Sequence, residues 1–390
     1  QLLHEHEEAL GPSIQRFSHA IPGGFLRYMN VETHSLYGPL FRQALSLQTI
    51  AHGWPVAVAT TRRELDVAAS LAKGTRTGPV EPNEYLERIV THTFQRILFG
   101  ITPGTPASEQ LTRVYAPLAS MALSDQPTRE ARTALDELRR MLRAQSDEWR
   151  RRSGGGDPPV CALGELGRLD ARMPDVTCVD NLVFIYKISS ANVAGLLRWL
   201  LAILGRHPEW IGRLRSELQA PEPSGPPALV DRIIMETLRL SQAEYLYRRL
   251  RLDLPFEGFV LPKGWLVRIC VWESHRNVEA FDEPERFNPD RFLGRDFSRA
   301  SYLPFGGDRH SCNGVALTNL ICRAFLEEMT RAYDWAVEGP VELERDFRHW
   351  SHWRPGRRLR LKLQPIIPST TASSATSLDG EAAAVDRSHH

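Results

Sequence analysis

The residue best suited to chemistry is Cys312, in the glycine-rich segment FGGDRHSCNG from Phe305 to Gly314. The amphipathic stretch VALTNLICRAFLEEMTRAY follows directly and predicts a helix. Glycines allow close backbone approach, and amides at a helix start favour an anionic sulfur, the form that binds metals. The alternative is a small buried cysteine without chemistry.

The spacing in this segment resembles the signature of the cytochrome P450 superfamily. That signature has a Phe seven residues before the Cys, a basic residue two before it and a Gly two after it, matched by Phe305, His310 and Gly314. The resemblance implies haem b, with the thiolate of Cys312 as axial iron ligand that favours O–O cleavage. It also makes Gly306 a cofactor-binding residue.

One position of the loop departs from the family. Asp308 stands four residues before the cysteine, where the family usually has glycine. If the position requires a positive φ angle, Asp tolerates it better than most residues, at some energetic cost.

Two companion motifs occur in the family's order. Glu236 and Arg239 form an ExxR motif on a predicted helix, and PERFNPDRF follows with Arg286 and Phe287. Alone, a Glu and an Arg three apart are commonly a solvated helix pair. With the cysteine loop, the resemblance implies a structural ion network of Glu236, Arg239 and Arg286.

The resemblance also implies cationic partners for the haem propionates, because buried carboxylates need charge-assisted donors. The candidates are His310, Arg248 (in competition with the next residue, also an arginine) and His34. The family often pairs such a histidine with an arginine one turn later, where this chain has Gly38. We expect Arg42 as a substitute.

The elements that position these residues follow from periodicity. Helical spacing predominates over 84–218, with one long apolar helix over 181–205, and another helix follows at 229–240. Short alternating runs over 247–271 predict a strand meander. We therefore expect a mainly α fold with a small segregated β region (α+β), P450-like over 5–363, with a shortened N-terminal part.

The long helix has a composition that could suit a bilayer, but Lys187, Asn192 and Arg198 interrupt it. We expect a buried core helix that begins after a capping box formed by Thr177 and Asp180.

By resemblance, this helix passes over the distal face of the haem. The family's acid–alcohol pair becomes Ala191 and Asn192. Alanine relays no protons, and an amide positions an oxygen or a substrate without titrating; alternatively, the amide is satisfied within the helix packing. A shift of register would bring Ser189 or Ser190 into the site instead.

Three functions stay open. The first is oxygen-dependent monooxygenation of a hydrophobic small molecule, in bacterial secondary metabolism. The second is a redox-neutral rearrangement, cyclisation, or nitrene or oxo group transfer on a substrate that already carries an N–O or O–O bond. The third is a non-catalytic haem-binding protein. The stretches 20–31, 182–192 and 240–247 are the candidate substrate pocket.

Composition limits the remaining classes. Of the 390 residues, 48 are Lys or Arg and 47 are Asp or Glu, so no overall field favours nucleic acid. The five cysteines are widely spaced and predict no disulfide framework, which fits a reducing cytoplasm. The first residues show no signal or anchor pattern.

Organisation and partners complete the expectations. We expect one monomeric haem-thiolate domain over 1–365 and a disordered tail over 366–390, where apolar residues are few. Ferredoxin with its reductase is the expected electron donor, docking near Arg309 and Arg323.

Overall fold

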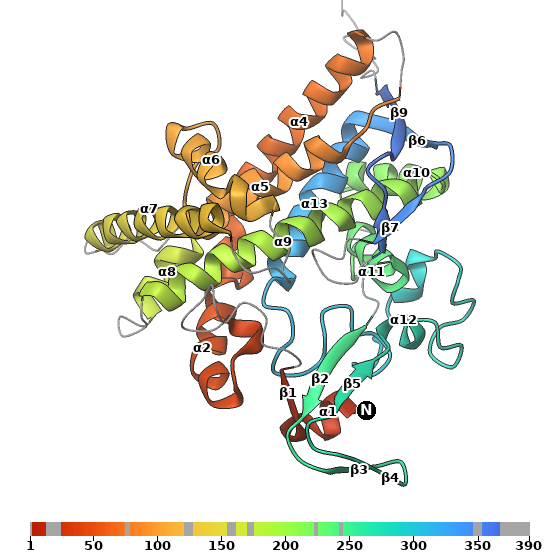
Figure 1. Ribbon diagram of the computed structural model, residues 1–390. Helices are drawn as coiled ribbons and strands as arrows, with labels where there is room; N and C mark the ends of the chain where they lie inside the picture. Colours follow the sequence, from red (N-terminus) through yellow and green to blue (C-terminus); the bar gives the residue numbers. More distant parts are fainter. Residues whose placement is uncertain are drawn as a thin grey trace, which may run out of the picture.

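The computed structural model describes residues 2–12, 25–74, 79–120, 128–153, 161–169, 175–221, 225–241, 245–345 and 353–366. Helices make up most of this part, and small antiparallel sheets lie to one side of them (Figure 1). The predicted mainly α fold with a segregated β region is therefore confirmed.

The helices and strands run in a simple order along the chain. The α-helices are α1 (Leu2–Glu5), α2 (Val31–Ala44), α3 (Leu47–Ile50), α4 (Trp54–Gly74), α5 (Asn83–Phe99), α6 (Pro106–Ser120), α7 (Arg129–Ser153), α8 (Ala162–Leu169), α9 (Asp175–Leu204), α10 (Pro208–Gln219), α11 (Leu229–Ser241), α12 (Val271–Ser274) and α13 (Val315–Ala332). The 3-10 helices are η1 (Glu7–Ala9), η2 (Leu26–Tyr28), η3 (Ala51–Gly53) and η4 (Pro289–Phe292). The strands are β1 (Leu10–Pro12), β2 (Leu246–Leu250), β3 (Leu254–Phe256), β4 (Phe259–Leu261), β5 (Leu266–Ile269), β6 (Tyr333–Glu338), β7 (Leu343–Arg345), β8 (Trp353–Pro355) and β9 (Arg360–Pro365).

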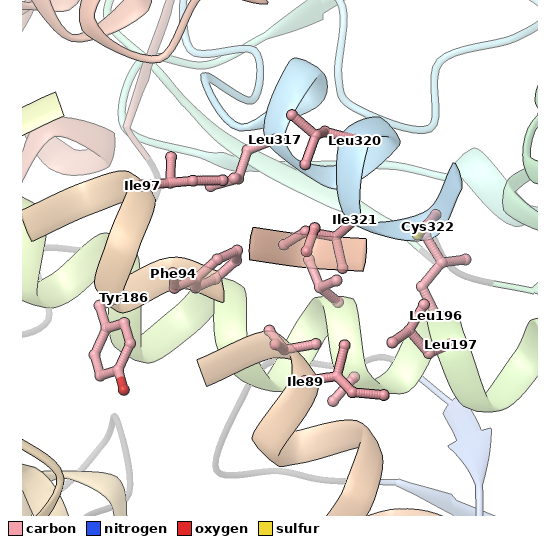
Figure 2. Close-up of a cluster of buried hydrophobic side chains, with 14 of the residues drawn as sticks. Ile89, Phe94, Ile97, Tyr186, Leu196, Leu197, Leu317, Leu320, Ile321 and Cys322 are labelled. Atoms are coloured by element: carbon pink, nitrogen blue, oxygen red, sulfur yellow. The ribbon is translucent and has the colours of Figure 1, made fainter. Parts of the chain in front are cut away.

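The core forms where α5, α9 and α13 meet. Figure 2 shows side chains from these three helices converging, among them Phe94, Leu197 and Ile321. Each of these three is at most 1% exposed. Because α9 is apolar on most of its circumference, it packs against helices on several sides, and its predicted place in the core is confirmed.

The long helix begins earlier than predicted. It includes Thr177 and Asp180, so the predicted capping box is wrong. Asp180 is fully buried and accepts two hydrogen bonds from Arg139 of α7, from Nε and from one terminal nitrogen, both at 2.7 Å. Its carboxylate therefore ties two helices together instead of capping one.

Among the helices of the described residues, α9 alone is long and apolar enough to cross a membrane, between Thr177 and Leu204. Most of its most apolar stretch is buried inside the protein. A core helix satisfies the same test, and burial supports that assignment here.

Strands form over 247–271 as predicted, but they pair as a hairpin and not as a meander. β3 and β4 form a separate two-stranded hairpin, while β2 and β5 belong to a three-stranded antiparallel sheet with the order β1-β2-β5. In this sheet Arg248 lies opposite Pro12 on one side and Val267 on the other. The hairpin β3–β4 turns at Glu257 and Gly258, which both have positive φ angles of 50° and 80°. The sheet thus holds Arg248 at a defined place beside the cysteine loop.

The single domain over 1–365 stays a prediction. The expected disordered tail over 366–390 lies outside the described residues, apart from Ile366.

The core makes a direct prediction. Leu197→Ala removes a side chain with 0% exposure from the α9 seam, and the remaining cavity should lower the free energy of unfolding by about 2–5 kcal/mol. Chemical denaturation followed by circular dichroism measures the shift. Leu36→Ala, at a position 57% exposed, is the matched control; equal shifts for both variants would contradict this view of the core.

Candidate functional site

The loop before α13 presents Cys312 to a cavity. The loop is closed by a hydrogen bond from Cys312 N to Phe305 O of 2.8 Å, and Gly314 N donates to Cys312 Sγ at 3.3 Å. Gly314 is also the N-cap of α13. The sulfur therefore lies at a helix start and accepts an amide hydrogen bond, as the sequence predicts.

Two opposing effects act on this thiol. Desolvation raises the pKa of Cys312, while the Gly314 amide and the charge of Arg27 lower it. The net direction is upward. A coordinating metal deprotonates a thiol outright.

The backbone strain of the loop falls on Gly306 and not on Asp308. Gly306 has a φ angle of 82°, whereas Asp308 is absent from the described residues with positive φ. Asp308 instead accepts a hydrogen bond from His310 N at 3.1 Å with its carboxylate. The aspartate at the family's glycine position thus has a polar role inside the loop.

The cavity has a volume of about 230 Å³. Helix α9 contributes the apolar side chains of Ile185, Ile188, Val193 and Leu196 to its lining. Parts of all three stretches predicted to form the pocket line it. The described lining residues from those stretches are Phe25, Leu26, Arg27, Ile185, Ile188, Ser189, Asn192, Tyr245, Leu246 and Tyr247.

Two predicted donors, His34 and His310, meet in this cavity. Their ring centroids are 4.2 Å apart with an interplanar angle of 51°. Burial is the largest cause lowering the pKa of each ring, and nearby arginines add to it, so both rings are neutral at pH 7. Both ring nitrogens of His310 are buried and have no hydrogen-bond partner in the structure.

The third predicted donor, Arg248, is buried beside them. Its guanidinium donates to both carboxylate oxygens of Asp308, at 2.6 and 2.8 Å. It also donates to Tyr247 O at 2.8 Å. Arg248 lines the cavity as predicted, but its charge is matched by an aspartate that the sequence did not connect with it.

Arg42 does not take the role expected of it as a partner of the haem carboxylates, and Gly38 has a steric role. A Cβ at Gly38 would lie 2.7 Å from Cε1 of His34, so the glycine makes room for the imidazole. Arg42 is not among the described residues that line the cavity. Its guanidinium donates to Arg309 O at 3.5 Å.

The ion network around Glu236 differs from the prediction in one arginine. Glu236 and Arg239 form a fully buried bidentate pair at 2.7 and 2.9 Å. The second arginine on Glu236 is Arg291, whose Nε lies 2.9 Å from Oε1. The side chain of Arg286 is 66% exposed and pairs with Glu283, so its predicted role is wrong; its carbonyl oxygen accepts from Arg291 at 3.1 Å instead.

The distal helix presents Asn192 and Ser189 to the cavity, while Ala191 is not among its described lining residues. The hydroxyl of Ser190 donates to Tyr186 O at 2.6 Å and is thereby held on the helix itself. Of the two serines considered as substitutes, only Ser189 reaches the cavity wall.

These residues fit a haem. Cys312 lines the cavity, neither buried ring nitrogen of His310 has a hydrogen-bond partner, and helix α9 adds apolar side chains to the lining. Cys312 would hold the iron, and His34 and His310 would meet the carboxylates. Cys312 is also the one cysteine among the described residues that line this cavity.

Sequence reasoning missed Arg291 and the pairing of Asp308 with Arg248. The second arginine of PERFNPDRF was a visible signal for Arg291. The proposed docking charges, Arg309 and Arg323, are each paired with a carboxylate, Arg309 with Glu7 at 3.1 Å and Arg323 with Asp231 at 3.1 Å. Neither offers an uncompensated charge to a partner.

Comparison with known proteins points in one direction. A family profile described as Cytochrome P450 matches residues 189–361. Abscisic acid 8'-hydroxylase 3 of Oryza sativa subsp. indica is 27% identical over 225 residues, which are 53% of this chain and 45% of that protein. Cytochrome P450 family 716 subfamily AD polypeptide 2 of Citrus sinensis is 31% identical over 43% of this chain and 37% of its own. The chain thus spans about half the length of the curated relatives it matches.

Solved structures show the same fold. The retinoic acid-bound cyanobacterial CYP120A1 superposes with a TM-score of 0.74 at 22% identity, covering 94% of this chain and 87% of its own. A zebrafish cytochrome P450 with progesterone gives a TM-score of 0.75 at 18% identity, covering 94% and 91%.

The corrected ion network is testable with two arginines of one motif. Arg291→Ala should lower the free energy of unfolding by about 3 kcal/mol or more, because it breaks a buried ion pair and leaves buried carbonyl oxygens unmatched. Arg286→Ala removes an exposed pair and should change it by less than about 1 kcal/mol. Thermal and chemical denaturation of both variants measure this; the reverse order would restore Arg286 to the network.

Proposed function

The chain belongs to the cytochrome P450 superfamily and carries a haem on a cysteine thiolate, and on that premise we propose that it is a monooxygenase. It would hydroxylate a hydrophobic small molecule. The observation that carries this proposal is that Cys312 and apolar side chains of α9 line the same cavity. Such a cavity holds an apolar substrate against the group that the cysteine binds.

The bound haem supplies dioxygen activation, and the protein supplies orientation and electrostatics. The side chains of Phe25, Ile185, Ile188 and Val193 line the cavity and exclude water from the substrate. Asn192 lies on the same wall, where its amide can donate one hydrogen bond and accept another. The net reaction consumes dioxygen, two electrons and two protons and yields an alcohol and water.

A second candidate reaction is favoured by the same helix. Neither Ala191 nor Asn192 titrates, so this wall has no acidic group at the place of the family's acid–alcohol pair. A rearrangement, cyclisation, or nitrene or oxo group transfer on a substrate that already carries an N–O or O–O bond needs no protons delivered to dioxygen. Electron demand separates the two reactions.

The names of the relatives support the substrate class. They include hydroxylases of abscisic acid, and the solved structures contain retinoic acid or progesterone. We further propose a cytoplasmic bacterial enzyme of secondary metabolism with a ferredoxin-type donor. The excess of Arg over Lys and the wide spacing of the five cysteines support that setting.

The proposal is tested with the purified haem-loaded chain and an extract of host metabolites. We expect a thiolate-type ferrous carbon monoxide spectrum, and new products only when reductant and oxygen are both present, with label from isotopic dioxygen. Cys312→Ser should lose that spectrum. Products that form without sustained electron input would replace hydroxylation with the second candidate reaction.

Asn192 provides a second prediction. If its amide positions oxygen or substrate, Asn192→Ala should reduce kcat/KM about tenfold, the value of one hydrogen bond of ~1.4 kcal/mol. Ser190→Ala is the matched control, since the Ser190 hydroxyl bonds to its own helix. Steady-state kinetics with the identified substrate measures kcat/KM of both variants. An unchanged kcat/KM in Asn192→Ala would show that Asn192 contributes only to helix packing.

A further inference from the structure

One buried carboxylate, that of Asp308, contacts a cation that lines the cavity, Arg248. Asp308 is 8% exposed, and Arg248 reaches it from strand β2, sixty positions earlier in the chain. The pair is bidentate, with distances of 2.6 and 2.8 Å. Burial opposes ionisation of Asp308, but the hydrogen bonds and charge of Arg248 outweigh it and hold the pKa of the carboxyl below its usual value.

Two arginines near this pair are engaged elsewhere. Arg309 is paired with Glu7, and Arg42 contacts the Arg309 carbonyl outside the cavity wall. Arg27 is a further arginine that lines the cavity. Arg248 differs from it in that its guanidinium lies in direct contact with a buried carboxylate behind the wall.

We propose that Asp308 is a positioning residue that sets the charge around the haem carboxylates by holding and neutralising Arg248. A haem carboxylate beside Arg248 would then meet a compensated guanidinium in place of a free cation. The inference rests on the haem and not on the proposed reaction, so the two can fail separately.

The consequence concerns the ease with which the iron is reduced. Reduction adds one negative charge to the haem, and an uncompensated cation nearby favours it. With Asp308 in place the charge of Arg248 is offset, which keeps the ferric form favoured. A purely structural pair would stabilise the loop without this effect on the iron.

The test measures the ferric–ferrous midpoint potential of the haem-loaded protein by spectroelectrochemistry. Asp308→Asn keeps the shape and the acceptor for His310 N but removes the charge, and the potential should shift to a more positive value. Arg248→Gln should shift it to a more negative value. The double variant, which removes both charges, should return close to the original potential.

The matched control is Asp180→Asn. Asp180 also forms a buried bidentate pair with an arginine, Arg139, at 2.7 Å, but neither residue lines the cavity. We expect this variant to lose stability and leave the potential unchanged. The comparison separates the loss of a buried ion pair from a change in charge beside the haem.

Each outcome decides the matter. If Asp308→Asn leaves the potential unchanged, as Asp180→Asn does, Asp308 is only a structural tie and the proposal is overturned. If Asp308→Asn does not retain haem, Asp308→Gly, which introduces the residue usual in the family, takes its place. If neither variant of Asp308 retains haem, the double variant at Asp308 and Arg248 decides. Retention of haem by the double variant supports charge compensation within the pair, and loss of haem in the double variant overturns the proposal.

Discussion

The fold around the cysteine depends on one buried carboxylate. Glu236 has no exposed surface, and burying a lone carboxylate would cost several kcal/mol. It is compensated by Arg239, by Arg291 and by the amide of Asn288, each within 2.9 Å. These partners come from α11 and from the segment around η4. The carboxylate of Glu236 therefore joins α11 to the segment around η4. Both segments precede the cysteine loop in the sequence.

The connection extends from there to the loop itself. The imidazole of His275 is fully buried, with Nδ1 at 3.1 Å from Arg239 O and Nε2 accepting from Leu303 N at 3.0 Å. Leu303 lies two residues before Phe305, whose carbonyl oxygen accepts from the Cys312 amide. A continuous series of buried polar contacts thus leads from Glu236 to the ligand loop.

Much of this arrangement was predictable from the sequence, because spacing within one element fixes geometry. The positions of Cys312 and Gly314 at a helix start and the ExxR pair on one helix are local patterns. Local patterns could not decide whether Arg286 or Arg291 pairs with Glu236. Both arginines belong to one motif, and only the packing of the folded chain buries the second. The pair of Asp308 with Arg248 joins a loop and a strand, and no periodicity predicts such a contact.

The distal helix illustrates why the fold leaves the chemistry open. The charged residues Asp180, Lys187 and Arg198 are each bound by groups of other elements, Arg139, backbone carbonyls near the end of α6, and Glu87 respectively. They join α9 to its neighbours without reaching the cavity. Asn192 lies on the cavity side of the same helix. Structure alone therefore leaves room for more than one reaction on the same scaffold.

Gly38 makes room for the imidazole of His34. Any side chain at this position would begin 2.7 Å from Cε1 of His34, so the imidazole would have to move to make room for it. With glycine at position 38, the ring keeps its place in the cavity wall beside the ring of His310. The position of the imidazole therefore depends on a residue that has no side chain of its own.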